Sequence, residues 1–411
     1  MKPAAGAQAT KRRTISQLTM TVAGIMSGTS ADGIDVALVQ ISSRTPPTSS
    51  CEWIPRMRLL GHIAVPYLTA VHKRILQMMN AADASVAEMA RLHWRLGQLY
   101  ADAVRAALRK YPVPLDLVGC HGQTIYHQGV ARSYLGGEVA CTWQMGEASA
   151  LAAQLGVPVV SDFRPADLVL GGQGAPLVPF LDYVAFRHPK RNRVLQNLGG
   201  IGNLTVIPAD ASQQDVFAFD TGPANMVIDA LMAECFGKPY DAKGATAVRG
   251  SVLDSVVRKC LQQRFFQAPP PKSAGREEFG REFATHFLTQ CRKLSPLPED
   301  AVATATALTA QSIGLAWRDF VQSALRDEPT DYIVAGGGVH NAALMKMIGE
   351  ELAAAGKIKL YTSDDFGIPA AAKEAVAFAL LAYQTWHGMP GNLPRATGAK
   401  RSAILGKITH G

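Results

Sequence analysis

Residues 24–39 read Gly24-Ile-Met-Ser-Gly-Thr-Ser-Ala-Asp-Gly-Ile-Asp-Val-Ala-Leu-Val39, and this stretch decides the fold. The apolar runs Val22–Met26 and Ile34–Ile41 flank a turn of Gly, Ser, Thr and Asp, which predicts two strands joined by a tight turn. Backbone N–H groups and hydroxyls in such a turn can surround a polyphosphate, and a carboxylate beside it can hold the magnesium of that polyphosphate. A plain polar hairpin would have the same local sequence, so this stretch alone leaves both interpretations open.

A second turn of this kind lies about 170 residues further along the chain. The run Arg193–Leu198 leads into Gly199-Gly-Ile-Gly-Asn203 and returns through Leu204–Ile207, which again predicts strand, glycine turn and strand. A third turn, Gly336-Gly-Gly338, follows the apolar run Tyr332–Ala335 and precedes a predicted helix, whose first N–H groups can face a ligand. Together the three turns favour nucleotide binding, and the recurrence predicts two related lobes.

Length and composition are those of a two-lobed globular protein. With 411 residues the chain exceeds the size at which one hydrophobic core keeps growing. Hydrophobic residues make up 48% and charged residues 18%, as in an ordinary ordered protein. Predicted strands alternate with predicted helices, which indicates the α/β class.

Charge and cysteine content limit the partners and the compartment. The net charge of +8 comes from Lys and Arg spread along the chain without a long basic run, so we expect no nucleic-acid partner, and small anionic ligands suit this charge equally well. No apolar run is long enough to span a membrane, and we expect no membrane partner. The six cysteines form no CxxC pair and no metal-ligand spacing, which indicates reduced thiols in a cytoplasmic protein.

The chain divides into three parts by these patterns. Residues 1–20 are polar, carry basic residues at 11–13 and lack the apolar core of a secretion signal, so we predict a disordered tail. We predict that lobe one comprises residues 21–155 together with 371–411, and that lobe two comprises residues 156–370.

Asp220 is the candidate for base chemistry. It stands at the end of the predicted strand Val216–Phe219 and precedes Gly222 and Pro223, so its carboxylate is held on rigid backbone. An Asp before a helix also serves as an N-cap, which is the ordinary alternative. Asn225 or Thr221 could supply the cap instead, and in that case Asp220 is free to act as a base.

Two further sites carry polar groups beside apolar runs. His121, Gln123 and Thr124 follow the predicted buried strand Leu115–Cys120 and offer donors and acceptors that suit sugar hydroxyls, although a histidine satisfied within a loop is equally compatible. Glu374 lies on a strongly apolar predicted helix. It is either a stray surface acid or a buried carboxylate that needs a polar ligand, because an unpaired buried one would be costly.

Several compound motifs resemble those of the anhydro-N-acetylmuramic acid kinase family, and the resemblance extends from about Val22 to Lys407. The matching motifs are Ser27-Gly-Thr-Ser-x-Asp-Gly-x-Asp35, His121-Gly-Gln-Thr124, Asp162-Phe-Arg164, Gly171-Gly-Gln-Gly-Ala-Pro-Leu177, Asn197-x-Gly-Gly200, Asp220-x-Gly-Pro-x-Asn225, Gly336-Gly-Gly338 and Glu374-Ala375. The resemblance implies two ribonuclease-H-like lobes of the actin, Hsp70 and sugar-kinase superfamily, with an ATP and sugar cleft between them. It also implies a homodimer.

The resemblance further implies an activity and a role for each matching residue. The activity converts 1,6-anhydro-N-acetylmuramic acid, ATP and water to N-acetylmuramic acid 6-phosphate and ADP, a step of peptidoglycan recycling. Asp220 would be the general base, and Asp32 would lie near Mg²⁺. The implied ATP-binding residues are Gly28, Thr29, Ser30, Asp32, Gly33, Asp35, Gly199, Gly200, Gly336, Gly337 and Gly338. The implied sugar-binding residues are His121, Gln123, Thr124, Gln173, Asn225 and Glu374.

The chain departs from the family pattern at Lys243, where relatives more often have Asp or Asn. It also shares details with levoglucosan kinase, a homologue that opens 1,6-anhydroglucose, a sugar without a lactyl group. The sequence does not place the residue that would meet the lactyl carboxylate. A nucleotide-gated binding protein of the same fold is a third alternative, which predicts slow or absent sugar-dependent ATP turnover and an extra partner-binding segment.

Overall fold

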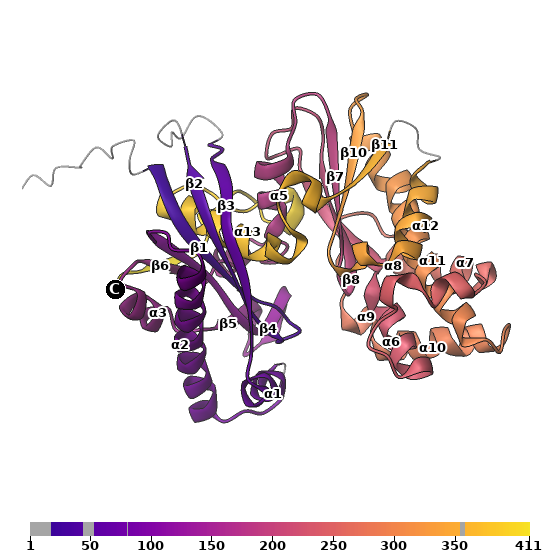
Figure 1. The fold of residues 1–411 in the computed structure, drawn as a ribbon, viewed down its shortest axis with the longest axis horizontal. Coiled ribbons are helices and arrows are strands. Elements are labelled where there is room, and N and C mark those ends of the chain that lie inside the picture. Colours follow the sequence, from indigo (N-terminus) through magenta and orange to yellow (C-terminus); the bar gives the residue numbers. More distant parts are fainter. Residues whose placement is uncertain (1–17, 44–52, 80, 354–357) are drawn as a thin grey trace, which may run out of the picture.

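The computed structural model describes residues 18–43, 53–79, 81–353 and 358–411 (Figure 1). Residues 1–17 of the predicted tail and Cys51 lie outside this part. Leu18 is buried and strand β1 begins at Thr19, so the last residues of the predicted tail belong to the first lobe. No helix in the described ranges is long and apolar enough to cross a membrane.

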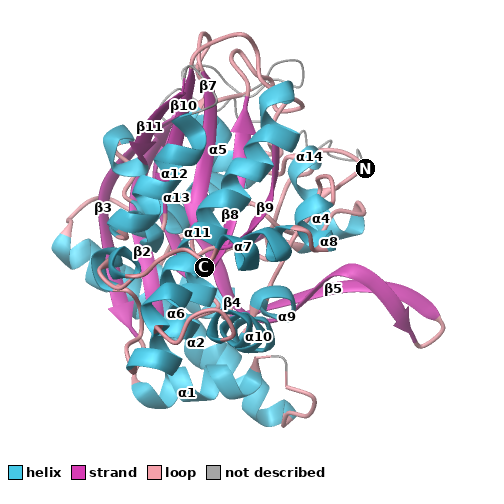
Figure 2. Cartoon of the chain, turned by 90° about the vertical axis from the view of Figure 1, so that its right-hand side faces the viewer, coloured by secondary structure: helices cyan, strands magenta, loops and turns pink. Residues whose placement is uncertain are grey.

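The first lobe contains a sheet in the order β12-β6-β4-β1-β2-β3. Strands β1, β2 and β3 are antiparallel, whereas β4 runs parallel to β1 and β6 runs parallel to β4. Strand β5 pairs with the outer half of β4, and the two form an arm that leaves the body of the lobe (Figure 2). The strands are β1 (Thr19–Ser27), β2 (Gly33–Ser42), β3 (Arg56–Pro66), β4 (Leu117–Tyr134), β5 (Gly137–Met145), β6 (Val159–Ser161) and β12 (Lys407–Thr409).

The second lobe repeats this topology in the order β11-β10-β7-β8-β9. Strands β7, β8 and β9 are antiparallel, and β10 and β11 continue the sheet in parallel to β7. The strands are β7 (Asn192–Leu198), β8 (Ile201–Ile207), β9 (Phe217–Pro223), β10 (Thr330–Ala335) and β11 (Ile358–Thr362). Three antiparallel strands followed by two parallel ones, present twice, confirm the predicted pair of ribonuclease-H-like lobes.

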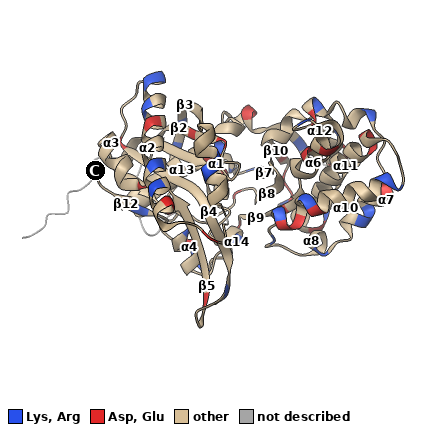
Figure 3. Cartoon of the chain, turned by 90° about the horizontal axis from the view of Figure 1, so that it is seen from below, with Lys and Arg blue, Asp and Glu red and all other residues tan. Residues whose placement is uncertain are grey.

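Helices cover the sheets and build a helical part on the second lobe (Figure 1). In a view from below, basic and acidic segments are interspersed along the helices of both lobes (Figure 3). The helices are α1 (Thr69–Met78), α2 (Val86–Lys110), α3 (Ala148–Leu155), α4 (Pro165–Val169), α5 (Val178–Phe186), α6 (Asn225–Phe236), α7 (Asp254–Leu261), α8 (Arg264–Gln267), α9 (Arg276–Phe279), α10 (Arg281–Arg292), α11 (Pro298–Ala316), α12 (Ala342–Ala353), α13 (Lys373–Trp386) and α14 (Pro394–Thr397).

Helices α5 and α13 lie between the two sheets and share one core with them. Helix α13 packs on β1, β2 and β4 of the first lobe, whereas α5 contacts both α13 and β8. The core joins Val22 of β1, Phe180 of α5, Phe378 of α13 and Leu195 of β7. Since β6 and β12 both belong to the first sheet, we propose that lobe one extends through β6 and includes α13 with the C-terminal segment.

Two strands continue beyond the ends that the sequence predicts. Strand β4 does not end at Cys120 but runs through His121 and Thr124, because its further residues pair with β5. Strand β9 likewise includes Asp220, which pairs with Asn203 of β8. Both candidate sites therefore lie on strand backbone.

The contact between α13 and the first sheet allows no side chain at two strand positions. A Cβ atom on Gly24 of β1 would lie 1.8 Å from the carbonyl oxygen of Ala375, and one on Gly119 of β4 would lie 2.2 Å from that of Phe378. The opposing atoms are helix backbone, so neither contact can be relieved by rotating a side chain.

We expect Gly24→Ala to lower the free energy of unfolding by about 3 kcal/mol or more, because the methyl group must push α13 away from the sheet. The matched control is Gly349→Ala on α12, where the nearest atom to an added Cβ is Leu360 Cδ2 at 4.0 Å. That change should be neutral or slightly stabilising. Urea unfolding of both variants measures the difference, and equal midpoints would contradict the proposed constraint.

Candidate functional site

A cavity of about 320 Å³ lies between the lobes and brings together residues that are far apart in the sequence. Three acids named in the sequence analysis line it, namely Asp35 of β2, Asp220 of β9 and Glu374 of α13. The other charged and amide side chains that line it are Arg164, Asp182, Asn197, Asn203 and Lys373. Since both sheets and both central helices contribute, this interlobe cleft is the candidate active site.

Asp220 is held at the cleft by a segment from the helical part of the second lobe. Its backbone N–H donates to the carbonyl oxygen of Lys272 at 3.0 Å, and its Oδ2 accepts from the backbone N–H of Ala274 at 2.8 Å. Burial raises the pKa of Asp220 to about 6, while the Ala274 N–H and the Lys272 charge act in the opposite direction. A carboxylate of this pKa is ionised near neutral pH and can still accept a proton there.

The other two acids differ in their surroundings. The side chain of Asp35 accepts from or ion-pairs with His62, whose Nε2 lies 2.9 Å from its Oδ1. Glu374 is reached by solvent across the cleft, yet protein surrounds it on most sides, and this desolvation raises its pKa. Arg164 and Lys373 favour the charged form of Glu374, and Asp35 opposes it.

Arg164, the last residue of the Asp162-Phe-Arg164 motif, is a cation that lines the cleft. Its Nε donates to Nε2 of His121 at 3.0 Å, and its Nη1 donates to the carbonyl oxygen of Gly174 at 2.7 Å. Neither acceptor is an anion, and these two bonds use two of the five N–H groups of the guanidinium, on which the charges of Glu374 and Asp167 also act. Burial lowers the pKa of Arg164 to about 10, which leaves it charged at neutral pH.

His121 supports Arg164 from behind. Its Nδ1 lies 2.7 Å from the carbonyl oxygen of Gly122 and so carries the proton, which leaves Nε2 as the acceptor for Arg164. The ring packs against Phe378 and is 3% exposed. Burial, with the Arg164 charge, lowers its pKa well below the usual value, so the imidazole is neutral. Both ring nitrogens are therefore used inside the protein.

Gln123 supports the first glycine turn. Its Oε1 accepts from Ser27 Oγ at 2.6 Å, and its Nε2 donates to the carbonyl oxygen of Gly28 at 3.1 Å. Gln123 is fully buried, whereas Thr29 and Ser30 of the turn are exposed. The turn is thus fixed from inside and presents its tip to solvent.

Thr124 and Gln173 are half-buried but are not among the residues that line the interlobe cleft. Thr124 Oγ1 accepts from Gln144 at 3.2 Å, within the β4–β5 pair. The backbone N–H of Gln173 donates to Thr397 at 2.8 Å. The backbone of Gln173 also approaches Gly129 of β4 closely, so this segment packs against the base of the arm.

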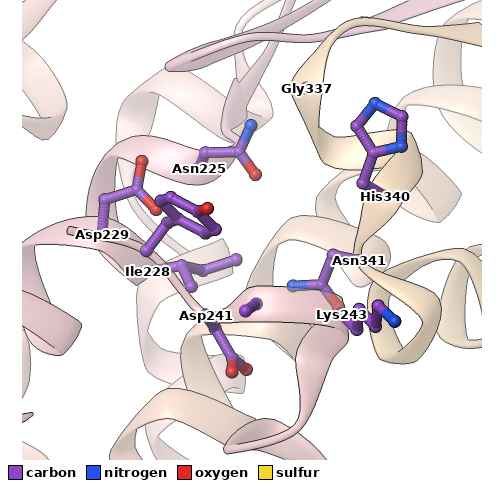
Figure 4. A pocket seen from close by; sticks show the side chains of 10 residues that line it. Asn225, Ile228, Asp229, Asp241, Lys243, Gly337, His340 and Asn341 are labelled. Atoms are coloured by element: carbon purple, nitrogen blue, oxygen red, sulfur yellow. The ribbon is translucent and has the colours of Figure 1, made fainter. Parts of the chain in front are cut away.

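A second cavity, of about 520 Å³, is lined by Gly337 of the third glycine turn (Figure 4). Asn225 lines this cavity and not the interlobe cleft; its Nδ2 donates to the carbonyl oxygen of Leu198, and its N–H donates to that of Gly199. Lys243, the departure from the family pattern, lies here with His340 and Asn341. The lining residues are Asn225, Ile228, Asp229, Tyr240, Asp241, Ala242, Lys243, Gly337, His340 and Asn341.

An ion pair between the central helices was not foreseen from the sequence. Lys373 Nζ of α13 lies 2.7 Å from Asp182 Oδ1 of α5, and both side chains are buried. Asp182 Oδ2 accepts from Thr205 of β8 at 2.9 Å. This chain of contacts joins the two lobes beneath the cleft.

The described residues contain no group of three or more His, Cys, Asp or Glu side chains placed to hold a metal ion. The side chain of Asp32 is exposed and does not line the cleft, whereas Asp35 does. Mg²⁺ that arrives with a nucleotide needs only one or two protein carboxylates, because phosphate and water oxygens supply the other ligands. Asp35 fits this requirement.

Comparison with known proteins gives a consistent match. The family model described as anhydro-N-acetylmuramic acid kinase matches residues 20–411. An anhydro-N-acetylmuramic acid kinase of Bacillus cereus (strain AH187) is 41% identical over 394 residues, covering 95% of this chain and 99% of that protein. One of Salinibacter ruber (strain DSM 13855 / M31) is 44% identical over 392 residues, covering 95% and 96%.

Among solved structures, the activator of the 2-hydroxyisocaproyl-CoA dehydratase from Clostridium difficile with bound ADPNP is 9% identical with a TM-score of 0.40. It covers 89% of this chain and 95% of that chain.

We expect Asp220→Asn to raise the free energy of unfolding by about 1–2 kcal/mol at pH 8. Because the pKa is raised on folding from its ordinary value of 3.8 to about 6, ionised Asp220 destabilises the fold above pH 6, and the effect disappears as pH falls below about 4. The asparagine can still accept from Ala274. Urea unfolding at pH 8 and pH 4 measures the gain, with the surface variant Asp102→Asn as the control. A loss of stability at pH 8 would contradict the expectation.

Proposed function

The chain belongs to the anhydro-N-acetylmuramic acid kinase family, and we propose that its interlobe cleft holds the sugar against Asp220 while the second cavity holds the nucleoside of ATP. The protein is a kinase that opens the 1,6-anhydro ring of 1,6-anhydro-N-acetylmuramic acid with water and phosphorylates O6 from ATP. The products are N-acetylmuramic acid 6-phosphate and ADP. The reaction is a step of peptidoglycan recycling.

Asp220 acts as the general base in this proposal. The bridging O6 is an ether oxygen without a proton, so the proton that must be removed belongs to the attacking water. Asp220 takes that proton as the water oxygen bonds to C1 and the C1–O6 bond breaks. The electron pair remains on O6, which then attacks the γ-phosphorus and displaces ADP. The observation that carries this role is a cleft carboxylate, fixed by Ala274, whose pKa of about 6 suits proton transfer near neutral pH.

The glycine turns serve the nucleotide. We assign Gly28, Thr29, Ser30 and Gly33 to one side of the phosphates and Gly199 and Gly200 to the other, since each group forms the turn of an antiparallel strand pair. The third turn, Gly336–Gly338, would run close to the nucleoside of ATP. Gly337 of this turn lines the second cavity. Lys243 then faces the nucleotide and not the sugar.

Mg²⁺ would be held by Asp35, with Asp32 at the edge of the same turn. Bound there, it would neutralise charge on the β- and γ-phosphates. Asp35 is fixed by His62, so its carboxylate is oriented before a ligand binds.

We assign the lactyl carboxylate of the sugar to Arg164, and we assign the sugar hydroxyls to Glu374. Arg164 has unused donors, a neutral support in His121 and a position on the cleft wall. The other cleft-lining cation, Lys373, is already paired with Asp182. A cationic wall suits the muramic sugar and gives no advantage to levoglucosan, and the named relatives favour the muramic reaction as well.

The cysteine pattern and the family resemblance bear on compartment and assembly. We propose a cytoplasmic location, because the cysteine pattern suits reduced thiols, and a homodimer, as in the family that the chain resembles.

Asp220→Asn should lower kcat by at least about a thousandfold, because the attacking water loses its base. ATP should still bind with unchanged affinity, since Asp220 is outside the second cavity. ADP release with each anhydro sugar and nucleotide titration measure the two effects. In the unchanged protein, kcat/KM should fall below about pH 6 as Asp220 becomes protonated. Near-normal turnover of the variant would refute the base assignment, and the absence of sugar-stimulated ADP release from the unchanged protein would favour a nucleotide-gated binder.

Arg164→Met should raise KM for 1,6-anhydro-N-acetylmuramic acid by about tenfold to a hundredfold, because the lactyl carboxylate loses a charge-assisted hydrogen bond. Turnover of levoglucosan, which has no carboxylate, should change much less. Arg164→Lys keeps the charge and should retain part of the preference. Equal losses on both sugars would show that Arg164 does not read the lactyl group.

A further inference from the structure

A segment of three residues covers the edge of the second sheet at Asp220. Strand β9 is the last strand of that sheet, so one side of its backbone has no strand neighbour. Residues 272–274, here called the strap, occupy that side at Asp220. The carbonyl oxygen of Lys272 accepts from the Asp220 N–H, and the backbone N–H of Ala274 donates to the Asp220 carboxylate. The strap therefore fixes both the backbone and the side chain of Asp220.

The Lys272 side chain anchors the strap to the helical part of the lobe. Its Nζ donates to the carbonyl oxygens of Phe265 and Phe266 in α8, each at 3.1 Å. The ammonium also lies over three aromatic rings, those of Phe219, Phe265 and Phe320, at 5.8, 5.0 and 4.8 Å from their centroids. Carbonyl oxygens and ring faces both favour a cation. One of these rings belongs to Phe219, the residue directly before Asp220.

An apolar side chain would fill such an aromatic cage without the cost of burying a charge, so packing does not account for the ammonium. Burial lowers the pKa of Lys272 to about 8, which leaves most of it charged at neutral pH. Its charge in turn opposes the effect of burial on the pKa of Asp220. The same lysine thus acts on Asp220 in two ways, through the backbone hydrogen bond of the strap and through the electrostatic effect of its charge.

Other charged groups face these two residues from the surrounding elements. Asp319, beyond α11, favours the charged form of Lys272. Across the cleft from Asp220 lie the acids Asp35, Asp182 and Glu374 and the cations Arg164 and Lys373. Of all these groups, Lys272 is the one whose charge contributes to the pKa shift of Asp220.

We propose that Lys272 is a positioning residue for the general base: its anchored side chain holds the strap that aims the Asp220 carboxylate, and its positive charge keeps that carboxylate ionised. This inference rests on the role of Asp220 proposed above. Lys272 itself is not among the residues that line the cleft.

The test compares Lys272→Gln, which keeps an N–H donor for the carbonyl oxygens but loses the charge, with Lys272→Arg, which keeps the charge. The kcat/KM for the anhydro sugar is measured from pH 5 to pH 8 for both variants, with Lys110→Gln on the surface as the control. Lys110 also lies over an aromatic ring, that of Tyr111 at 5.3 Å, but it is the last residue of α2 and is not among the residues that line the cleft. Thermal melting and nucleotide titration report the folded fraction and ATP binding.

We expect the acidic limb of the Lys272→Gln profile to move up by about 0.5–1 pH unit, with about a twofold to fivefold loss of kcat/KM at pH 6 and unchanged ATP affinity. Lys272→Arg should keep the limb of the unchanged protein. The inference would be overturned if the acidic limb of the Lys272→Gln pH profile stays where it is in the unchanged protein. It would also be overturned if the limb moves equally in both variants. If Lys272→Gln does not fold, Lys272→Met, which also removes the charge, takes its place in the same comparison with Lys272→Arg.

Failure of the inference is distinguishable from failure of the proposed function. If Asp220 is not the base, Asp220→Asn retains turnover. If only the inference is wrong, Asp220→Asn remains inactive while the Lys272→Gln profile coincides with that of the unchanged protein.

Discussion

The contact between helix α13 and the first sheet is the constraint on which the cleft depends. Gly24 and Gly119 let the helix backbone approach the strands more closely than any side chain would permit. The short distance between helix and sheet determines where the first turn of α13 lies. This turn carries Lys373 and Glu374, which line the cleft. The ion pair of Lys373 with Asp182 then ties α13 to α5, so the packing on one sheet also determines how the second lobe faces the first.

The charged groups of the cleft are stabilised unequally, and the differences follow their roles. Lys373 and Asp182 are buried as a pair, which suits a structural contact. Asp220 and Glu374 instead have raised pKa values because burial is not fully compensated. Groups left in this state cost stability, and such uncompensated carboxylates are typical of active sites. The cleft therefore contains both kinds of group within one cavity of about 320 Å³.

The glycine turns and the alternation of strands and helices were sufficient to predict two related lobes, because both features are local in sequence. Asp220 and Glu374 could be selected for the same reason, one at a strand end and one on an apolar helix. The roles of His121 and Gln123 as supports were not predictable, since they depend on contacts with Arg164 and Ser27, 43 and 96 residues away. The strap on Asp220 likewise joins positions 54 residues apart.

Repetition of one topology explains why the two lobes contribute different chemistry to the same cleft. Each lobe supplies a hairpin turn at equivalent positions, which suits a ligand such as a polyphosphate that needs contacts from two sides. The groups proposed for bond cleavage and sugar recognition lie outside the repeated turns, on β9, α13 and the segment around Arg164. A change in sugar preference would thus require changes at those positions, while the turns proposed to contact the nucleotide would stay as they are.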